Sequence, residues 1–178
     1  MLGTSLPTLN GKLSEIYEPN VPHPSQRLDL LTDAHKAGIA TFVAIAPVFP
    51  EVGYAGMLKV FQAVKAAKPM TIFMEPVNLR LGIAERIAER AKEIGVEMDM
   101  TVYDGGPAWA QYAIQSLRDA ERAAEATGQF ARLHLWPDYE ALGSKKVVTA
   151  QENPEAYLKW LRSYWNRVSE WPGKTKEK

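Results

Sequence analysis

Apolar residues along the chain form short continuous runs that alternate with longer stretches in which they recur at helical spacing. A short apolar run bounded by turn residues is typical of a buried strand, whereas recurrence on one helical face is typical of an amphipathic helix. The apolar runs predict strands at residues 2–9, 39–47, 70–76 and 96–106, with a further candidate at 130–137.

The stretches between these runs predict helices. The clearest is segment 82–95, because Ile83, Ile87 and Ile94 share one face while alternating glutamates and arginines form a solvated face. A second long helix opens at Pro107 and closes at Gly128. In order along the chain, the predicted helices cover residues 23–38, 55–67, 82–95, 107–128 and 154–171.

The alternation of strands and helices predicts an α/β fold with a parallel sheet. Its helix-to-strand connections are short, as where Gly38 and Gly95 lead directly into apolar runs. The strands are too few for a closed eight-stranded barrel, which leaves an open sheet or a partial barrel. We expect a partial (β/α) barrel, a half-barrel of about four to five parallel strands flanked by helices, in residues 1–128. Residues 129–178 would form an extension with an added C-terminal helix that packs on the same domain.

Composition narrows the function classes. The chain has 178 residues, a formal net charge of zero and no cysteine. Bulk charge therefore gives no indication of nucleic-acid or membrane binding. The absence of cysteine excludes disulfides, thiolate metal sites and cysteine nucleophiles within the chain. The histidines are far apart, so no metal site is predicted, and the absence of a signal-like or membrane-length apolar run predicts a cytoplasmic protein.

Polar side chains gather at the predicted carboxyl ends of the strands, where parallel α/β proteins bind ligands. One interpretation is local and structural, in which Glu75 and Asp104 cap the following helices or pair with Arg80. Their coincidence on one rim favours a ligand-binding mouth. No residue is identified as catalytic. The candidates at strand ends are Ser5, Thr8, Pro47, Glu75, Asn78, Arg80, Tyr103 and Asp104.

Three phrases of the sequence carry a family resemblance: SLPTLN at 5–10, IYEPNVPHPSQRLDLLTDAHKAGIATFVAIAPVFPE at 16–51, and MEPVNLR at 74–80. In this order they resemble the second half of the radical S-adenosylmethionine barrel, in the branch that contains spore photoproduct lyase. The resemblance covers roughly residues 1–105. It implies a half-barrel that contacts S-adenosylmethionine.

The resemblance also implies roles for individual residues. Ser5 would face the methionine end of the nucleotide, and Glu18 with Arg27 would lie near the cofactor. The backbone at Pro47 and Val48 would approach the adenine. The substrate side of the mouth would be lined by Glu75, Asn78 and Arg80, with Asp104 on the same rim.

The chain lacks one feature of the family, and this feature is required for the family's radical chemistry. The family holds an iron–sulfur cluster with a CxxxCxxC loop, and this cysteine-free chain contains no such loop. The chain would therefore be a detached C-terminal half that performs no radical chemistry alone. Its open edges and concave face predict a homo-oligomer or a separate cluster-bearing N-terminal half as partner.

Two alternatives stay open from the sequence, so enzymatic activity is undecided. The chain could be a stand-alone α/β binding or assembly module. It could also be a hydrolase or lyase that uses Glu75 and Asp104 as an acid–base pair.

Overall fold

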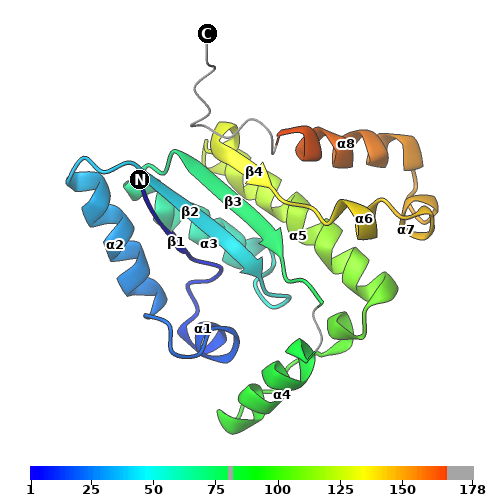
Figure 1. The fold of residues 1–178 in the computed structure, drawn as a ribbon, viewed down its shortest axis with the longest axis horizontal. Helices are drawn as coiled ribbons and strands as arrows, with labels where there is room; N and C mark the ends of the chain where they lie inside the picture. Colours follow the sequence, from blue (N-terminus) through cyan, green and yellow to red (C-terminus); the bar gives the residue numbers. More distant parts are fainter. Residues whose placement is uncertain (80–81, 168–178) are drawn as a thin grey trace.

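The computed structural model describes residues 1–79 and 82–167 and has four parallel strands in the order β1-β2-β3-β4. The strands are β1 (Leu2–Ser5), β2 (Thr41–Val48), β3 (Thr71–Pro76) and β4 (Leu133–Leu135). Helical segments connect each strand to the next, as Figure 1 shows. The fold is α/β, with the sequential strand order of a partial (β/α) barrel.

The helices differ widely in length. α5 is the longest described helix, with 21 residues. The α-helices are α1 (Gly11–Tyr17), α2 (Pro24–Lys36), α3 (Gly53–Val64), α4 (Ile83–Glu93), α5 (Gly106–Ala126), α6 (Tyr139–Leu142), α7 (Lys145–Thr149) and α8 (Pro154–Arg167). Single-turn 3₁₀ helices are η1 (Lys65–Ala67), η2 (Thr101–Asp104) and η3 (Phe130–Arg132). None of the helices within residues 1–79 and 82–167 is both long and apolar enough to cross a membrane.

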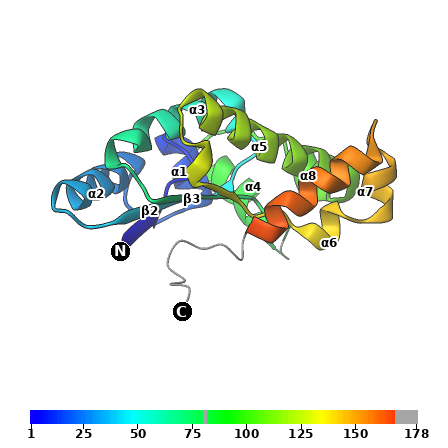
Figure 2. The ribbon, with the colours of Figure 1, turned by 90° about the horizontal axis from the view of Figure 1, so that it is seen from above.

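The hydrophobic core lies on one face of the sheet. Seen from above in Figure 2, α3 and α5 lie together on that face. Alternate residues of β2 and β3 point toward these helices and have no exposed surface, namely Val43, Ile45, Ile72 and Met74. Along α5, small residues such as Ala113 are fully buried, which allows the helix to approach the core closely.

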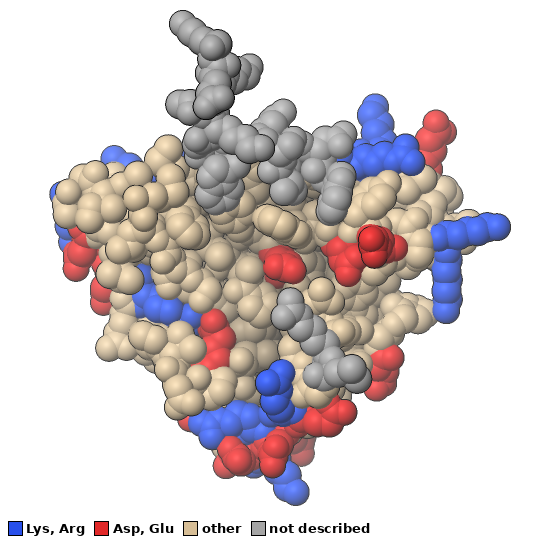
Figure 3. All heavy atoms as spheres, in the orientation of Figure 1, with Lys and Arg blue, Asp and Glu red and all other residues tan. Residues whose placement is uncertain are grey.

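The opposite face of β1–β3 carries no described helix in either view (Figures 1 and 2). We call it the open face. Strand register places four residues side by side across it, since Ser5 pairs with Ala44, Ala44 with Phe73 and Phe73 with His134. All four are partly exposed. Figure 3 shows that most of the described surface on this side is uncharged, with scattered acidic side chains and a basic side chain beside one of them.

Aromatic rings cover much of the open face. The Phe73 ring lies 6.2 Å from Phe42 and 5.8 Å from His134, between ring centroids. Phe42 extends over β1, where a Cβ added to Gly3 would come within 2.3 Å of its ring. Trp136 follows β4 and is 46% exposed. The sequence at Gly3 thus leaves room for an aromatic layer that no described helix covers.

The strand predicted at 96–106 is wrong. β3 pairs directly with β4, so the sheet has no position for a strand between them. Val96, Met98 and Met100 instead pack against a small cluster formed by Ile87, Ala91 and Ile16. These three residues alternate with exposed polar ones and are partly buried, a pattern with the same period as a half-buried strand.

The other elements follow the predictions more closely. The helices expected at 23–38, 55–67, 82–95 and 107–128 are α2 to α5. The further candidate strand is confirmed as β4, which lies beyond residue 128, so the sheet extends into the predicted C-terminal extension. The last predicted helix is α8 as far as Arg167, and its remaining residues lie outside the described residues.

Candidate functional site

A polar cluster lies where β1 ends, and we call it the rim cluster: Ser5, Ser14, Glu18 and Arg27. Arg27 donates from NH1 to a Glu18 carboxylate oxygen at 2.9 Å, and from NH2 to the Ser14 hydroxyl at 2.8 Å. The Ser5 hydroxyl donates to the other Glu18 oxygen at 3.3 Å. The Arg27 and Glu18 side chains are only 3% and 12% exposed. Three residues that the family resemblance assigned to the cofactor therefore meet at one point.

Local structure explains how these residues come together. Asn10 caps α1 by accepting from the backbone N–H of Lys12 at 3.0 Å, which fixes the helix that carries Ser14. Glu18 follows the last turn of α1. α2 begins with Pro24 and a capping box at His23, and Arg27 occupies its first turn. The rim cluster thus joins one strand and two helix ends.

The Arg27 guanidinium leaves one group unsatisfied. Its Nε is buried and has no hydrogen-bond partner in the described part of the chain. NH1 also donates to the Ser5 carbonyl at 3.1 Å, so the other two nitrogens are bonded. A buried charge with this many fixed contacts orients its carboxylate partner rigidly.

The two predicted adenine contacts have different surroundings. Pro47 is exposed and lines a cavity of about 360 Å³ that opens near Tyr17 and Phe49. Val48 is 1% exposed, and its carbonyl accepts from the Val77 N–H at 3.0 Å and from the Tyr112 hydroxyl. Since both lone pairs of that carbonyl are in use, Pro47 is the better placed of the two to contact a ligand.

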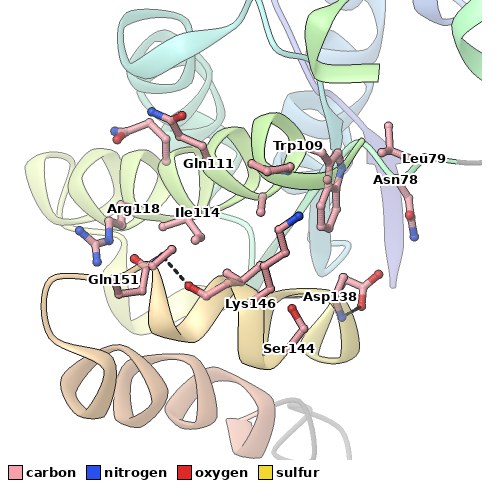
Figure 4. Close-up of a pocket in the computed structure, with 17 residues that line it drawn as sticks. Asn78, Leu79, Trp109, Gln111, Ile114, Arg118, Asp138, Ser144, Lys146 and Gln151 are labelled. Atoms are coloured by element: carbon pink, nitrogen blue, oxygen red, sulfur yellow. Dashed lines mark hydrogen bonds between the residues drawn. The ribbon is translucent and has the colours of Figure 1, made fainter. Parts of the chain in front are cut away.

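The predicted substrate residues lie in different elements of the fold. Glu75 is in β3, two residues after Phe73, and therefore points to the open face. Asn78 is exposed and lines a different pocket, formed with α5, α6 and α7 (Figure 4). Asp104 was expected to end a strand and instead lies exposed in η2, because the strand at 96–106 is absent. Arg80 lies outside the described residues.

Sequence reasoning missed one cluster near the same end of the sheet. The Tyr17 hydroxyl lies 2.8 Å from a Glu51 carboxylate oxygen, to which it donates, and 2.7 Å from the Tyr103 hydroxyl. The Tyr17 ring stacks on Phe49 with 3.8 Å between centroids. Tyr17 and Glu51 both lie within the family-like phrase at 16–51, which was the available signal. Nothing local in the sequence connects either of them to Tyr103.

Burial changes the titration of this cluster. Desolvation raises the pKa of Tyr17 above its ordinary value, and the hydrogen bond with Tyr103 adds to the rise. Desolvation also raises the pKa of Glu51, although the hydrogen bond from Tyr17 opposes the rise. The cluster therefore disfavours negative charge on both groups.

The raised pKa of Glu51 predicts a pH-dependent stability difference for Glu51→Gln. A group with a raised folded-state pKa stabilises the fold fully below its unfolded pKa, and this contribution is lost as pH rises through the folded pKa. Glutamine keeps an acceptor for Tyr17 without the charge. Glu51 is exposed, so solvent screens its charge. We therefore expect the variant to match the unmodified protein in acid and to exceed it by only roughly a few tenths of a kcal/mol at neutral pH. Urea unfolding at both pH values measures this, and a variant that is less stable at neutral pH would contradict it.

No three or more histidine, aspartate or glutamate side chains within residues 1–79 and 82–167 form a group that could hold a metal ion. At the rim, the described residues supply hydrogen bonds, one buried ion pair and aromatic surface.

Comparisons with known proteins give one informative match. The chain is 30% identical over 135 residues to the uncharacterized protein ORF301 of Acidianus two-tailed virus. The match spans 76% of this chain and 41% of that protein, so the chain covers less than half of its relative's length. No protein-family model matches the chain, and no solved structure shows significant similarity to it. The class defined by the fold is a parallel α/β partial barrel with an open sheet face.

Proposed function

We propose that the chain is a ligand-binding half-barrel that contributes part of an S-adenosylmethionine site to a larger assembly and is not catalytic alone. The observation that carries the proposal is the rim cluster. Ser5, Glu18 and Arg27 were singled out by the family resemblance, and they meet at the carboxyl end of β1, beside the open face.

The chemistry of these residues suits such a ligand. The methionine end of S-adenosylmethionine carries an ammonium group, and its sulfonium is also cationic. The Glu18 carboxylate is paired with Arg27 at 2.9 Å, so the pair is neutral, and its oxygens would contact the ammonium group as hydrogen-bond acceptors. The Ser5 hydroxyl would bond a polar group beside it. The exposed Pro47 backbone stays the proposed adenine contact, and the aromatic layer at Phe73 and Phe42 offers a further stacking surface for the purine.

The open face supports the second part of the proposal, which is completion by a partner. A sheet face with exposed aromatic side chains, such as Trp136 at 46%, is typical of an interaction surface. The complementary part would be a second copy or a separate cluster-bearing half, located with this chain in the cytoplasm. Because the chain has no cysteine, any iron–sulfur cluster that reduces the sulfonium must come from that part.

Isothermal titration calorimetry with S-adenosylmethionine tests the proposal. We expect measurable binding that weakens about fivefold in Ser5→Ala, since one neutral hydrogen bond is lost. Ser163→Ala is the matched control, because Ser163 is exposed on α8 and donates only to the Trp160 carbonyl. If the unmodified protein fails to bind, both alone and with a cluster-bearing half, the cofactor role is wrong.

The open face also favours a second candidate, a stand-alone assembly module with no ligand at the rim. In that case association between chains would persist in Ser5→Ala, and calorimetry would show no heat of binding. The acid–base alternative stays a prediction, with Glu75 in β3 and Asp104 in η2 as its two carboxylates.

A further inference from the structure

A second concave site lies away from the open face. It is a pocket of about 630 Å³ between the amino-terminal half of α5, the segment that follows β3, and α6 with α7 (Figure 4). We call it the α5–α7 pocket. This volume is in the range that holds small-molecule ligands. The apolar side chains that line it include Leu79, Trp109, Ile114 and Val147.

Hydrogen bonds fix the walls of this pocket. The Trp109 indole N–H donates to the Val77 carbonyl at 2.8 Å, and Trp109 is only 7% exposed. Asp138 accepts from the Ala141 N–H at 3.0 Å and so caps α6. Gln151, which lies just after α7, donates from its side chain to the Val147 carbonyl on α7 at 3.0 Å. The cavity is therefore formed in advance of any ligand.

Among the described residues, few charged side chains line the pocket, and they differ in whether they already contact other groups of the protein. Its charged lining residues are Arg118, Asp138 and Lys146. The Arg118 guanidinium lies over the Trp160 ring, 5.4 Å from its centroid, and Asp138 is held at the start of α6. Lys146 extends from α7 into the pocket toward α5 (Figure 4). Among the described residues, no side chain forms an ion pair or hydrogen bond with its ammonium group.

We propose that the α5–α7 pocket binds a small, mostly apolar organic molecule with a single anionic head group. The Lys146 ammonium would pair with the head group, and the apolar body would lie against Trp109, Ile114 and Val147. A net charge of one positive unit from the charged lining residues favours an anion over a cation. The apolar walls favour a hydrophobic body over a sugar or a free phosphate. This site is separate from the rim cluster and does not depend on S-adenosylmethionine binding.

Two fluorescent probes with related ring systems test the proposal: anilinonaphthalene sulfonate, which is anionic, and phenylnaphthylamine, which is neutral. Lys146 is exposed, so its contact with an anion is screened by solvent. We expect Lys146→Met to weaken sulfonate binding about threefold, because this contact is lost, and to leave phenylnaphthylamine binding unchanged. Lys145→Met is the matched control, since Lys145 is exposed like Lys146 but does not line the pocket. It should change neither affinity.

Val147→Trp provides a second variant that fills the pocket and should weaken both probes. Circular dichroism of each variant verifies that it is folded. Sulfonate bound elsewhere, including on the open face, would be indifferent to Lys146. The proposal is overturned if Lys146→Met leaves sulfonate affinity unchanged, or if it weakens both probes equally.

Discussion

Arg27→Met is expected to lower the free energy of unfolding by about 3–5 kcal/mol, as when one partner of a buried ion pair is removed. The variant leaves the Glu18 carboxylate, 12% exposed, without the guanidinium that it accepts from. It also removes the donor that lies 2.8 Å from the Ser14 hydroxyl. Urea unfolding followed by circular dichroism measures the loss.

Arg90→Met is the matched control for this prediction. Arg90 also makes two carboxylate contacts, with Glu15 at 3.0 Å and Glu93 at 2.8 Å, but both carboxylates are more than half exposed. Its replacement should cost less than about 1 kcal/mol. The double variant Arg27→Met with Glu18→Leu should recover part of the loss, since no charge is left unpaired. A cost for Arg27→Met no greater than that for Arg90→Met would show that the rim cluster is not a buried ion pair.

Phe61→Ala is expected to destabilise the protein by about 3–5 kcal/mol, while Phe73→Ala should cost less than half as much. Phe61 is fully buried on α3, on the covered side of the sheet, and its removal leaves a cavity between the sheet and the helices. Phe73 lies on the open face and is partly exposed, so solvent can fill the space that its ring leaves. Urea unfolding of both variants at low protein concentration gives the comparison.

The contrast between these two phenylalanines also tests the layering of the fold. Equal losses at low concentration would mean that the open face is covered by another part of the chain. A loss for Phe73→Ala that grows with protein concentration would instead indicate that association between chains covers it.

The sequence predicted those elements whose local signals agree with their packing. β3 and α4 lie within one or two residues of the expected bounds. The apolar run at β3 is consistent only with a buried strand, and the amphipathic spacing at α4 only with a surface helix. The segment from Val96 to Met100 carried a strand-like alternation that packing on α4 satisfies equally well. The segment could have been a strand or a loop packed on α4. The direct pairing of β3 with β4 shows that it is not a strand of the sheet, and this pairing joins parts of the chain that are distant in sequence.

The contacts of the candidate site also fall into two groups, those that local sequence motifs indicate and those that only the folded chain creates. Ser5, Glu18 and Arg27 are within a short stretch whose order of motifs could be read, and the structure brings them together. Tyr17 and Tyr103 meet across 86 positions, and no local pattern encodes that contact. Glu75 and Asn78 are close in sequence but belong to different surroundings, since Glu75 lies within β3 and Asn78 follows its end and lines the α5–α7 pocket.

The central claim is that the rim cluster and the open face form a binding surface for S-adenosylmethionine. Titration of the isotope-labelled protein with this nucleotide, followed through backbone amide chemical shifts, tests the claim directly. We predict that the shifts concentrate at Ser5, Glu18, Ala44 and Phe73. Shifts confined to the helices on the covered face or to the α5–α7 pocket, or no shifts at saturating nucleotide, would contradict it.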